Sequence, residues 1–218
     1  LLPPALHRML TAFQRLAISS PSARAEMDAV RSLKAFCVTS EAFRNSLPIV
    51  VEAFDILSRA RRVDSELAGI VSRWIVENHD PRFVKMWLSQ MVVVAYAGVG
   101  VREEKILSWT ARLGVERYGL GQLTADGICA LAAAFAKLHF YDYEIFERIM
   151  DVIVERYENL SGKQYAVLLH SLASVGYRKG ERNPLPGLKD LGEVTVRESS
   201  SIIWASATLE WEYDVRIL

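Results

Sequence analysis

The sequence has few cysteines, few turn-forming residues and no excess of charge of either sign. Its 218 residues include 2 cysteines, 12 glycines and 7 prolines, and 26 basic side chains balance 26 acidic ones. Two cysteines are too few for a disulfide scaffold, and the low glycine and proline content favours helices over a turn-rich β fold. The balanced charge argues against a domain that wraps nucleic acid by bulk electrostatics. A hydrophobic fraction of 51% excludes a disordered chain.

Long apolar runs are also missing. The longest stretch without a charged side chain lies between Lys85 and Arg102 and contains sixteen residues. As a helix it would span about 24 Å, which is less than the roughly 30 Å of the hydrocarbon layer of a bilayer. We therefore expect no membrane span.

What the sequence does contain is an internal repeat. A small residue followed by an aromatic or large residue, with an aliphatic residue three positions further on, recurs along the chain. The small residues follow one another at steps of 41, 42, 39, 37 and 34 residues, at Ala12, Ala53, Ala95, Ala134, Ser171 and Ala205. The alternative interpretation is a globular domain whose helices happen to have similar lengths.

Each repeat has the pattern of two helices. In the fourth repeat, apolar residues at i, i+3, i+4 and i+7 predict a first helix with Ile128, Leu131, Ala132 and Phe135 and a second helix with Phe146, Ile149, Met150 and Ile153. Asp142 is the predicted N-cap of that second helix, and Asp64 is its counterpart in the second repeat. Ser161 with Gln164 predicts a capping box. His139 takes the place of Gly176 at the end of a first helix.

These observations predict an all-α fold, an α-solenoid of about five to six helix-hairpin repeats of roughly 37–42 residues. Short loops force consecutive helices antiparallel, and hairpins that bury a face only against their neighbours stack in a row. We expect the repeats to occupy residues 1–182. A loop or short extended segment is expected at 183–198, and a further repeat helix is expected to begin within 199–218.

Two aligned segments carry a family resemblance. The sequences LTADGICALAAAFAKLHF (123–140) and LSGKQYAVLLHSLASVGY (160–177) resemble the heptatricopeptide and octotricopeptide helical repeats. Such repeats accompany RAP domains in organellar proteins and resemble those of the FAST-kinase-like proteins. The resemblance implies an α-solenoid in the mitochondrial matrix or a plastid. It also implies contact with organellar RNA, or a structural role in a mitochondrial ribosome. A RAP domain is not recognisable in this sequence.

Basic and aromatic side chains gather at the predicted turns between paired helices. The candidate RNA- or partner-binding residues are Arg59, Arg61, Arg62, Arg102, Tyr141, Tyr177, Arg178, Lys179 and Arg182. If the repeats stack in register, the basic residues would lie along one edge and could follow a phosphate backbone, while the aromatic rings could stack on bases. The alternative interpretation is that the turns are polar because they are solvated, and that the aromatic rings belong to the core.

The sequence contains no recognisable catalytic signature. The histidines have no metal-ligand spacing with cysteines or carboxylates, and no phosphate-binding loop is present. We expect a non-enzymatic protein with no catalytic residues, metal, cofactor or small-molecule substrate. The first hypothesis is a component or assembly factor of a mitochondrial ribosome that contacts ribosomal RNA and neighbouring proteins. The second is a scaffold subunit of a large mitochondrial complex without nucleic acid, for which the five tryptophans would be interface anchors.

Overall fold

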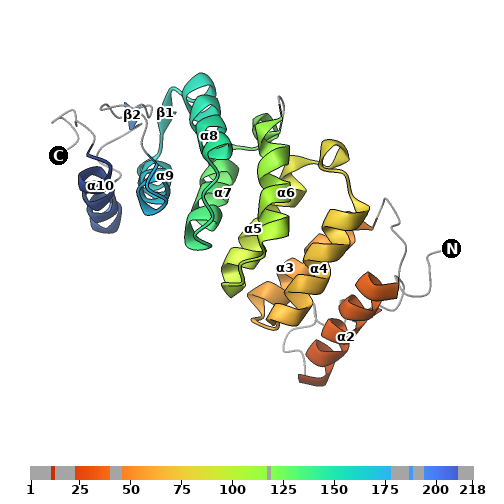
Figure 1. The fold of residues 1–218 in the computed structure, drawn as a ribbon. Helices are drawn as coiled ribbons and strands as arrows, with labels where there is room; N and C mark the ends of the chain where they lie inside the picture. The colour runs from red at the N-terminus through yellow and green to blue at the C-terminus, as the bar shows by residue number, and fades with distance from the viewer. Residues whose placement is uncertain are drawn as a thin grey trace. The chain divides into compact units, whose positions relative to one another are not determined.

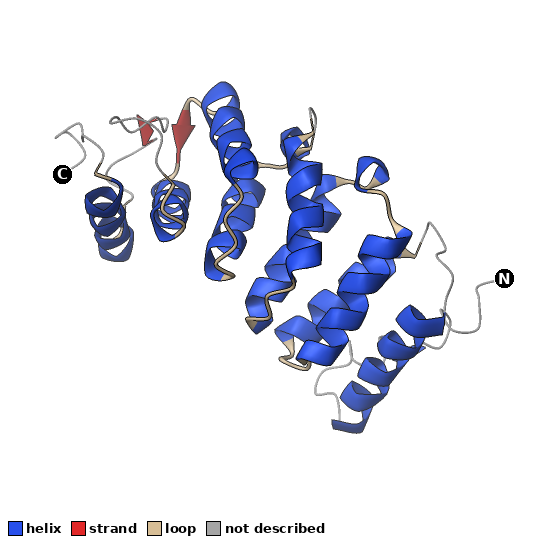
Figure 2. Cartoon of the chain, in the orientation of Figure 1, coloured by secondary structure: helices blue, strands red, loops and turns tan. Residues whose placement is uncertain are grey.

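The computed structural model describes residues 11–12, 23–39, 46–116, 119–177, 187–188 and 194–210. Over these residues the chain is almost entirely helical (Figure 2). The elements are α2 (Ala23–Thr39), α3 (Leu47–Arg59), α4 (Ser65–Asn78), η1 (Pro81–Phe83), α5 (Met86–Val99), α6 (Glu104–Val115), η2 (Leu120–Gln122), α7 (Ala125–Lys137), α8 (Tyr143–Arg156), β1 (Asn159–Leu160), α9 (Gly162–Ser174), β2 (Gly187–Leu188) and α10 (Val196–Leu209). The predicted all-α class is confirmed. The two strands are a two-residue parallel pair, with Asn159 opposite Gly187.

The chain divides into two compact units. The first comprises Leu1–Val84 with Met91–Trp109, and the second comprises Lys85–Gln90 with Thr110–Leu218, so that α5 and α6 contribute to both. In the first unit α2 packs against α3 and α4. In the second unit α9 packs against both α7 and α10, and α8 packs against α7 (Figure 1).

The predicted apolar stripes form the cores of these units. In the second unit, the eight stripe residues of α7 and α8 are all buried, and the Phe135 ring lies 6.3 Å from the ring of Phe146. In the first unit, Phe36 of α2 contacts Trp74 of α4 with ring centroids 5.8 Å apart. Burial of each such side chain contributes about 1.5–3 kcal/mol to folding. Packing between helices, rather than helix propensity alone, therefore holds each unit together.

A left-handed residue follows five helices of the described chain. These residues, which we call the αL residues, are Arg61 (φ 55°) after α3, Gly100 (73°) after α5, His139 (51°) after α7, Gly176 (68°) after α9 and Glu210 (54°) after α10. In the first four cases the next backbone N–H donates to a carbonyl five residues earlier, as from Tyr177 to Leu172 at 2.9 Å. This is the Schellman termination. The predicted equivalence of His139 and Gly176 is confirmed. We call these five helices first-type helices.

The αL residues give the repeat length in the described chain. They follow one another at steps of 39, 39, 37 and 34 residues. Three of these steps lie within the predicted 37–42 residues, and only the last is shorter. Four predicted anchors lie five residues before an αL residue, namely Ala95, Ala134, Ser171 and Ala205, but Ala53 lies eight before Arg61. The anchor in α3 was therefore wrong by about one helical turn. Apolar stripes repeat every turn, so neighbouring registers look alike in sequence.

Helix starts follow the predicted chemistry. The Asp64 and Asp142 carboxylates accept hydrogen bonds from Leu67 N (2.7 Å) and Ile145 N (3.1 Å), which confirms both N-caps. Ser161 and Gln164 form the predicted capping box at α9. A second capping box, between Thr195 and Glu198, starts α10 at Val196. The loop or short extended segment expected at 183–198 therefore ends too late, because α10 already begins at Val196. Residues 183–186 and 189–193 lie outside the described residues.

Candidate functional site

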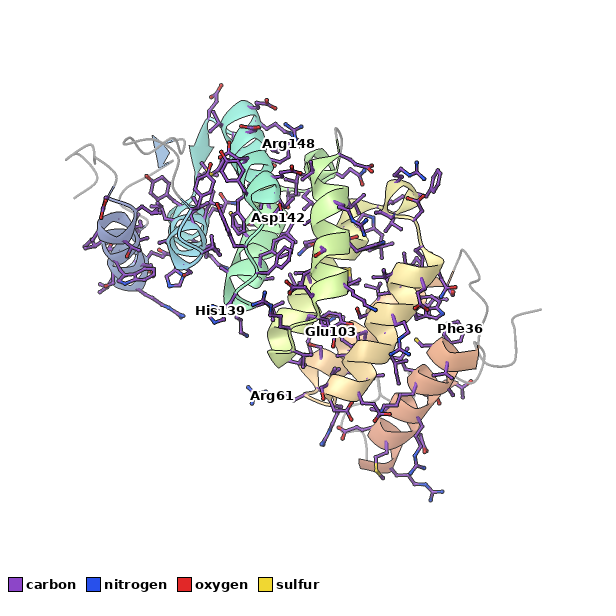
Figure 3. The ribbon with its side chains drawn as sticks, in the orientation of Figure 1. Phe36, Arg61, Glu103, His139, Asp142 and Arg148 are labelled. Carbon is purple, nitrogen blue, oxygen red and sulfur yellow. The ribbon has the colours of Figure 1, made fainter. Side chains whose placement is uncertain are left out.

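The arginines predicted at the turns are exposed, and most of them have carboxylate partners. Arg59 is ion-paired with Asp55, Arg62 with Glu26 at 2.7 Å, and Arg102 with Glu104 at 3.0 Å. The hydrogen bond from Arg102 lowers the pKa of Glu104. Arg61 carries the αL conformation and is exposed (Figure 3); among the described residues it has no ion pair. These partners offset much of the positive charge expected at the turns.

The aromatic candidates differ in accessibility. Tyr177 is 0% exposed and its hydroxyl donates a hydrogen bond to Glu147, so its ring cannot stack on an external base and that prediction is wrong. The reason is the Schellman turn, which folds the residue after Gly176 back over the core. Tyr141, two residues after the αL residue His139, is 46% exposed. Arg178, Lys179 and Arg182 lie outside the described residues.

A second surface lies on the first-type helices, away from the turn residues. It is formed by the residues 13, 9, 6 and 2 positions before each αL residue, because this spacing places them on one face of the helix. In the second unit they are Asp126, Ala130, Ala133 and Lys137 on α7, Lys163, Val167, His170 and Ser174 on α9, and Arg197, Ser201, Trp204 and Thr208 on α10. Each of these side chains is exposed or half-buried. Because α9 packs against both α7 and α10, the three stripes form one continuous surface.

A groove of about 740 Å³ runs along this surface. Its charged lining consists of Lys137, Lys163, Arg197 and Glu198, together with His139 and His170. The Glu198 carboxylate accepts a hydrogen bond from Thr195 N at 2.8 Å, and this bond lowers the pKa of Glu198. The nearby carboxylate of Asp126 accepts a hydrogen bond from Gln164 at 2.9 Å. Three cations therefore face a groove whose one lining carboxylate is engaged in capping α10.

An aromatic pair borders the groove. The rings of His170 on α9 and Trp204 on α10 lie 4.9 Å apart with planes inclined by 36°. Trp204 is 47% exposed, so part of its ring is accessible to a ligand. Cations beside an exposed ring are the combination that binds a phosphate backbone and stacks a base.

Sequence reasoning missed these residues although a signal was present. Lys163 and Arg197 occupy the same position of successive repeats, and so do His170 and Trp204. That equivalence needs the correct repeat register, which the αL residues supply. His170 is exposed on α9.

Several other features bear on chemistry. Burial raises the pKa of the Cys37 and Cys129 thiols to about 12, so both are protonated at neutral pH. Within the described ranges, no three His, Cys, Asp or Glu side chains are grouped to hold a metal ion. None of the described helices is long and apolar enough to cross a membrane. Comparison with protein-family models and with curated proteins finds no match.

Proposed function

We propose that this chain is a non-enzymatic helical-repeat protein that contacts single-stranded RNA through the groove on α7, α9 and α10. The observation that carries the proposal is the coincidence of three cations and an exposed tryptophan on one face of successive repeats. A row of Lys and Arg side chains can bind the phosphates of a nucleic-acid backbone. Proteins recognise RNA sequence mainly in single-stranded regions, where the bases are unpaired and can stack on aromatic side chains.

The α-solenoid belongs to this proposal. Repeated helix ends at regular steps, and the packing of α9 against α7 and α10, support a row of stacked hairpins. Two side-chain hydrogen bonds join residues about one repeat apart: Gln164 Nε2 donates to Asp126, 38 residues earlier, and Arg156 donates to the Gly121 carbonyl, 35 residues earlier. Bonds of this kind are expected between neighbouring hairpins of a solenoid.

The organellar setting rests on the family resemblance of residues 123–177. We propose that the protein works in the mitochondrial matrix, as a component or assembly factor of the mitochondrial ribosome that contacts ribosomal RNA and adjacent proteins. In that setting the balanced overall charge is compatible with RNA contact, because one local basic groove meets the RNA while other surfaces meet protein.

The test is fluorescence anisotropy of a labelled 20-nucleotide single-stranded RNA at a series of KCl concentrations. Three phosphate contacts on a single strand give a slope of log affinity against log salt of about −2. Replacing two groove cations, as in K163Q/R197Q, should reduce that slope by about 1.4 and weaken binding for all sequences.

A matched control keeps this test specific. The variant R73Q/K105Q removes the same charge from exposed positions on α4 and α6, away from the groove. It should bind RNA with the wild-type salt slope. Equal losses in the two variants, or binding that does not depend on salt, would show that the groove is not the RNA site.

The scaffold alternative also has an observation in its favour. Phe83 of η1 is 85% exposed and Trp87 at the start of α5 is 42% exposed. Large aromatic side chains, tryptophan above all, are the residues that most often anchor protein interfaces. Purification of the complex with nuclease distinguishes the two functions: a scaffold keeps its protein partners when RNA is digested, whereas an RNA-dependent assembly loses them.

A further inference from the structure

His170 in the groove has one ring nitrogen held by its own helix. The Ser174 hydroxyl oxygen lies 2.7 Å from the His170 carbonyl oxygen and 3.3 Å from His170 Nδ1. A hydroxyl has one proton to donate. The carbonyl is the closer acceptor, and it is the usual one for a serine four residues later in a helix. The Ser174 oxygen therefore accepts a hydrogen bond from Nδ1, which carries the proton of the neutral ring.

The position of that proton decides what His170 presents to a ligand. With the proton on Nδ1, the Nε2 atom of a neutral imidazole offers only a lone pair. The side chain is exposed, and nothing in the described part of the chain forms a hydrogen bond with Nε2. Phosphate oxygens only accept hydrogen bonds. Nε2 can therefore contact a phosphate only after it takes up a second proton, which makes both ring nitrogens donors.

The other imidazole of the groove is not restricted in this way. His139 follows α7 and is exposed (Figure 3), and its ring forms no hydrogen bond with the described residues. Either nitrogen of its neutral ring can carry the proton. A neutral His139 can therefore turn an N–H toward a phosphate without a change of charge.

The groove can hold a charged His170. Its ring lies 4.9 Å from the ring of Trp204, within the roughly 6 Å over which an indole face attracts a cation. The elements packed against α9 contribute charges of both signs, and β1 contributes none. The charged or titratable side chains that line the groove around His170 are Lys137 and His139 from α7 and its end, Lys163 from α9, and Arg197 and Glu198 from α10. The cations oppose a further positive charge until a phosphate neutralises them.

We propose that His170 binds an RNA phosphate only as the imidazolium, so that RNA binding in the groove takes up a proton and strengthens as the pH falls. This inference rests on the proposed function, because the phosphate is that of RNA in the groove. Ser174 is a positioning residue, since its hydroxyl fixes which nitrogen of the neutral ring carries the proton. Imidazoles change charge between pH 5 and 8, whereas Lys and Arg side chains remain charged over that range.

The experiment compares RNA binding at pH 8.0 and pH 5.5. The probe is a labelled 20-nucleotide oligouridylate, whose bases are neutral at both values, and the full chain is titrated by fluorescence anisotropy. The affinity of the wild type should rise at least about fivefold at pH 5.5. The slope of log affinity against log salt should steepen by about 0.7, the amount expected for one added phosphate contact on a single strand.

Four variants separate His170 from the rest of the groove. H170Q should bind as the wild type does at pH 8.0 and should show no rise at pH 5.5. H139N removes the other imidazole and should keep most of the rise. S174A frees the tautomer and should bind more tightly than the wild type at pH 8.0, which reduces the rise. S174T keeps a hydroxyl at this position and should restore it.

A direct readout of the tautomer accompanies the titrations. Proton–nitrogen correlation spectra of the histidine rings at pH 8.0 should show the His170 proton on Nδ1. A proton on Nε2 would overturn the inference, because the neutral ring could then donate to a phosphate.

The outcomes also distinguish this inference from the proposed function. If the wild type bound no RNA at either pH, the proposed function would be refuted and the role of His170 with it. Salt-dependent binding with equal affinity at both pH values would keep the RNA groove and overturn the role of His170. So would a pH-dependent rise that H170Q retains, or a loss of H170Q binding at pH 8.0, where the neutral ring should make no phosphate contact.

Discussion

Substitutions at the αL residues test whether these residues end equivalent helices. Replacing a glycine there should lower stability, and introducing a glycine should raise it. In the variant G176A, a β-carbon is added to a backbone with φ of +68°, and no atom lies within 4 Å of it. The effect is therefore conformational and not steric. The left-handed conformation costs an L-residue about 1–2 kcal/mol, and alanine recovers about 0.4–1 kcal/mol by restricting the unfolded chain. The expected net loss of stability is about 0.5–1 kcal/mol, and G100A should behave alike.

The reverse substitution tests the same reasoning. His139 holds φ of 51° at the equivalent position and is exposed, so H139G removes the strain without emptying the core. It should raise the free energy of unfolding by a similar amount. Most substitutions lower the free energy of unfolding, so an increase caused by a new glycine would be distinctive.

Thermal unfolding monitored by circular dichroism is the assay. For a chain of this size, 1 kcal/mol shifts the midpoint by about 2–4 °C. G121A is the control, because Gly121 is exposed and its φ lies outside the left-handed region. A G176A midpoint equal to that of G121A, or a lower midpoint for H139G, would refute the assignment of these residues as the shared helix ends.

Three further predictions follow from local contacts. D142A should lower stability by about 1 kcal/mol in urea unfolding because it removes the α8 cap, while D151A at an exposed site on the same helix should not. Cys37 and Cys129 should react with iodoacetamide at pH 8 at least roughly a hundredfold more slowly than in the unfolded chain, because burial holds both as thiols; rapid labelling of either would contradict their burial. Hydrogen bonds from Arg82 lower the pKa of Asp80 to about 2, so the carboxylate stabilises the fold above about pH 4 and this contribution disappears as the pH falls through 2. The urea midpoints of wild type and D80N should therefore converge over that range, and a constant gap would argue against the ion pair.

Local chemistry in the sequence was sufficient for the helices and most of their starts. Asp64, Asp142 and Ser161 cap helices as expected, since an N-cap interacts only with backbone three residues ahead. The start of α10 was missed although Thr195 and Glu198 form a capping box that the sequence displays. The alternating residues around Val194 favoured an extended chain, and the packing of α10 on α9 outweighed that preference.

Features that depend on the backbone conformation or on distant residues could not be predicted from the sequence. The burial of Tyr177 depends on the turn at Gly176, and the wrong anchor at Ala53 came from a choice among equivalent helical turns. The backbone angles of Gly176 and Arg61 were needed to decide both. The arginines of the turns were found correctly as exposed side chains, but their carboxylate partners, such as Glu26 for Arg62, come from distant parts of the chain.

The sequence by itself determined the helical class, the apolar stripes and the cap residues, because these depend on side chains and backbone within about four residues of one another. Only the tertiary structure decided which exposed positions share a surface. Lys137, Lys163 and Arg197 line one groove because α9 packs between repeats that are far apart in sequence.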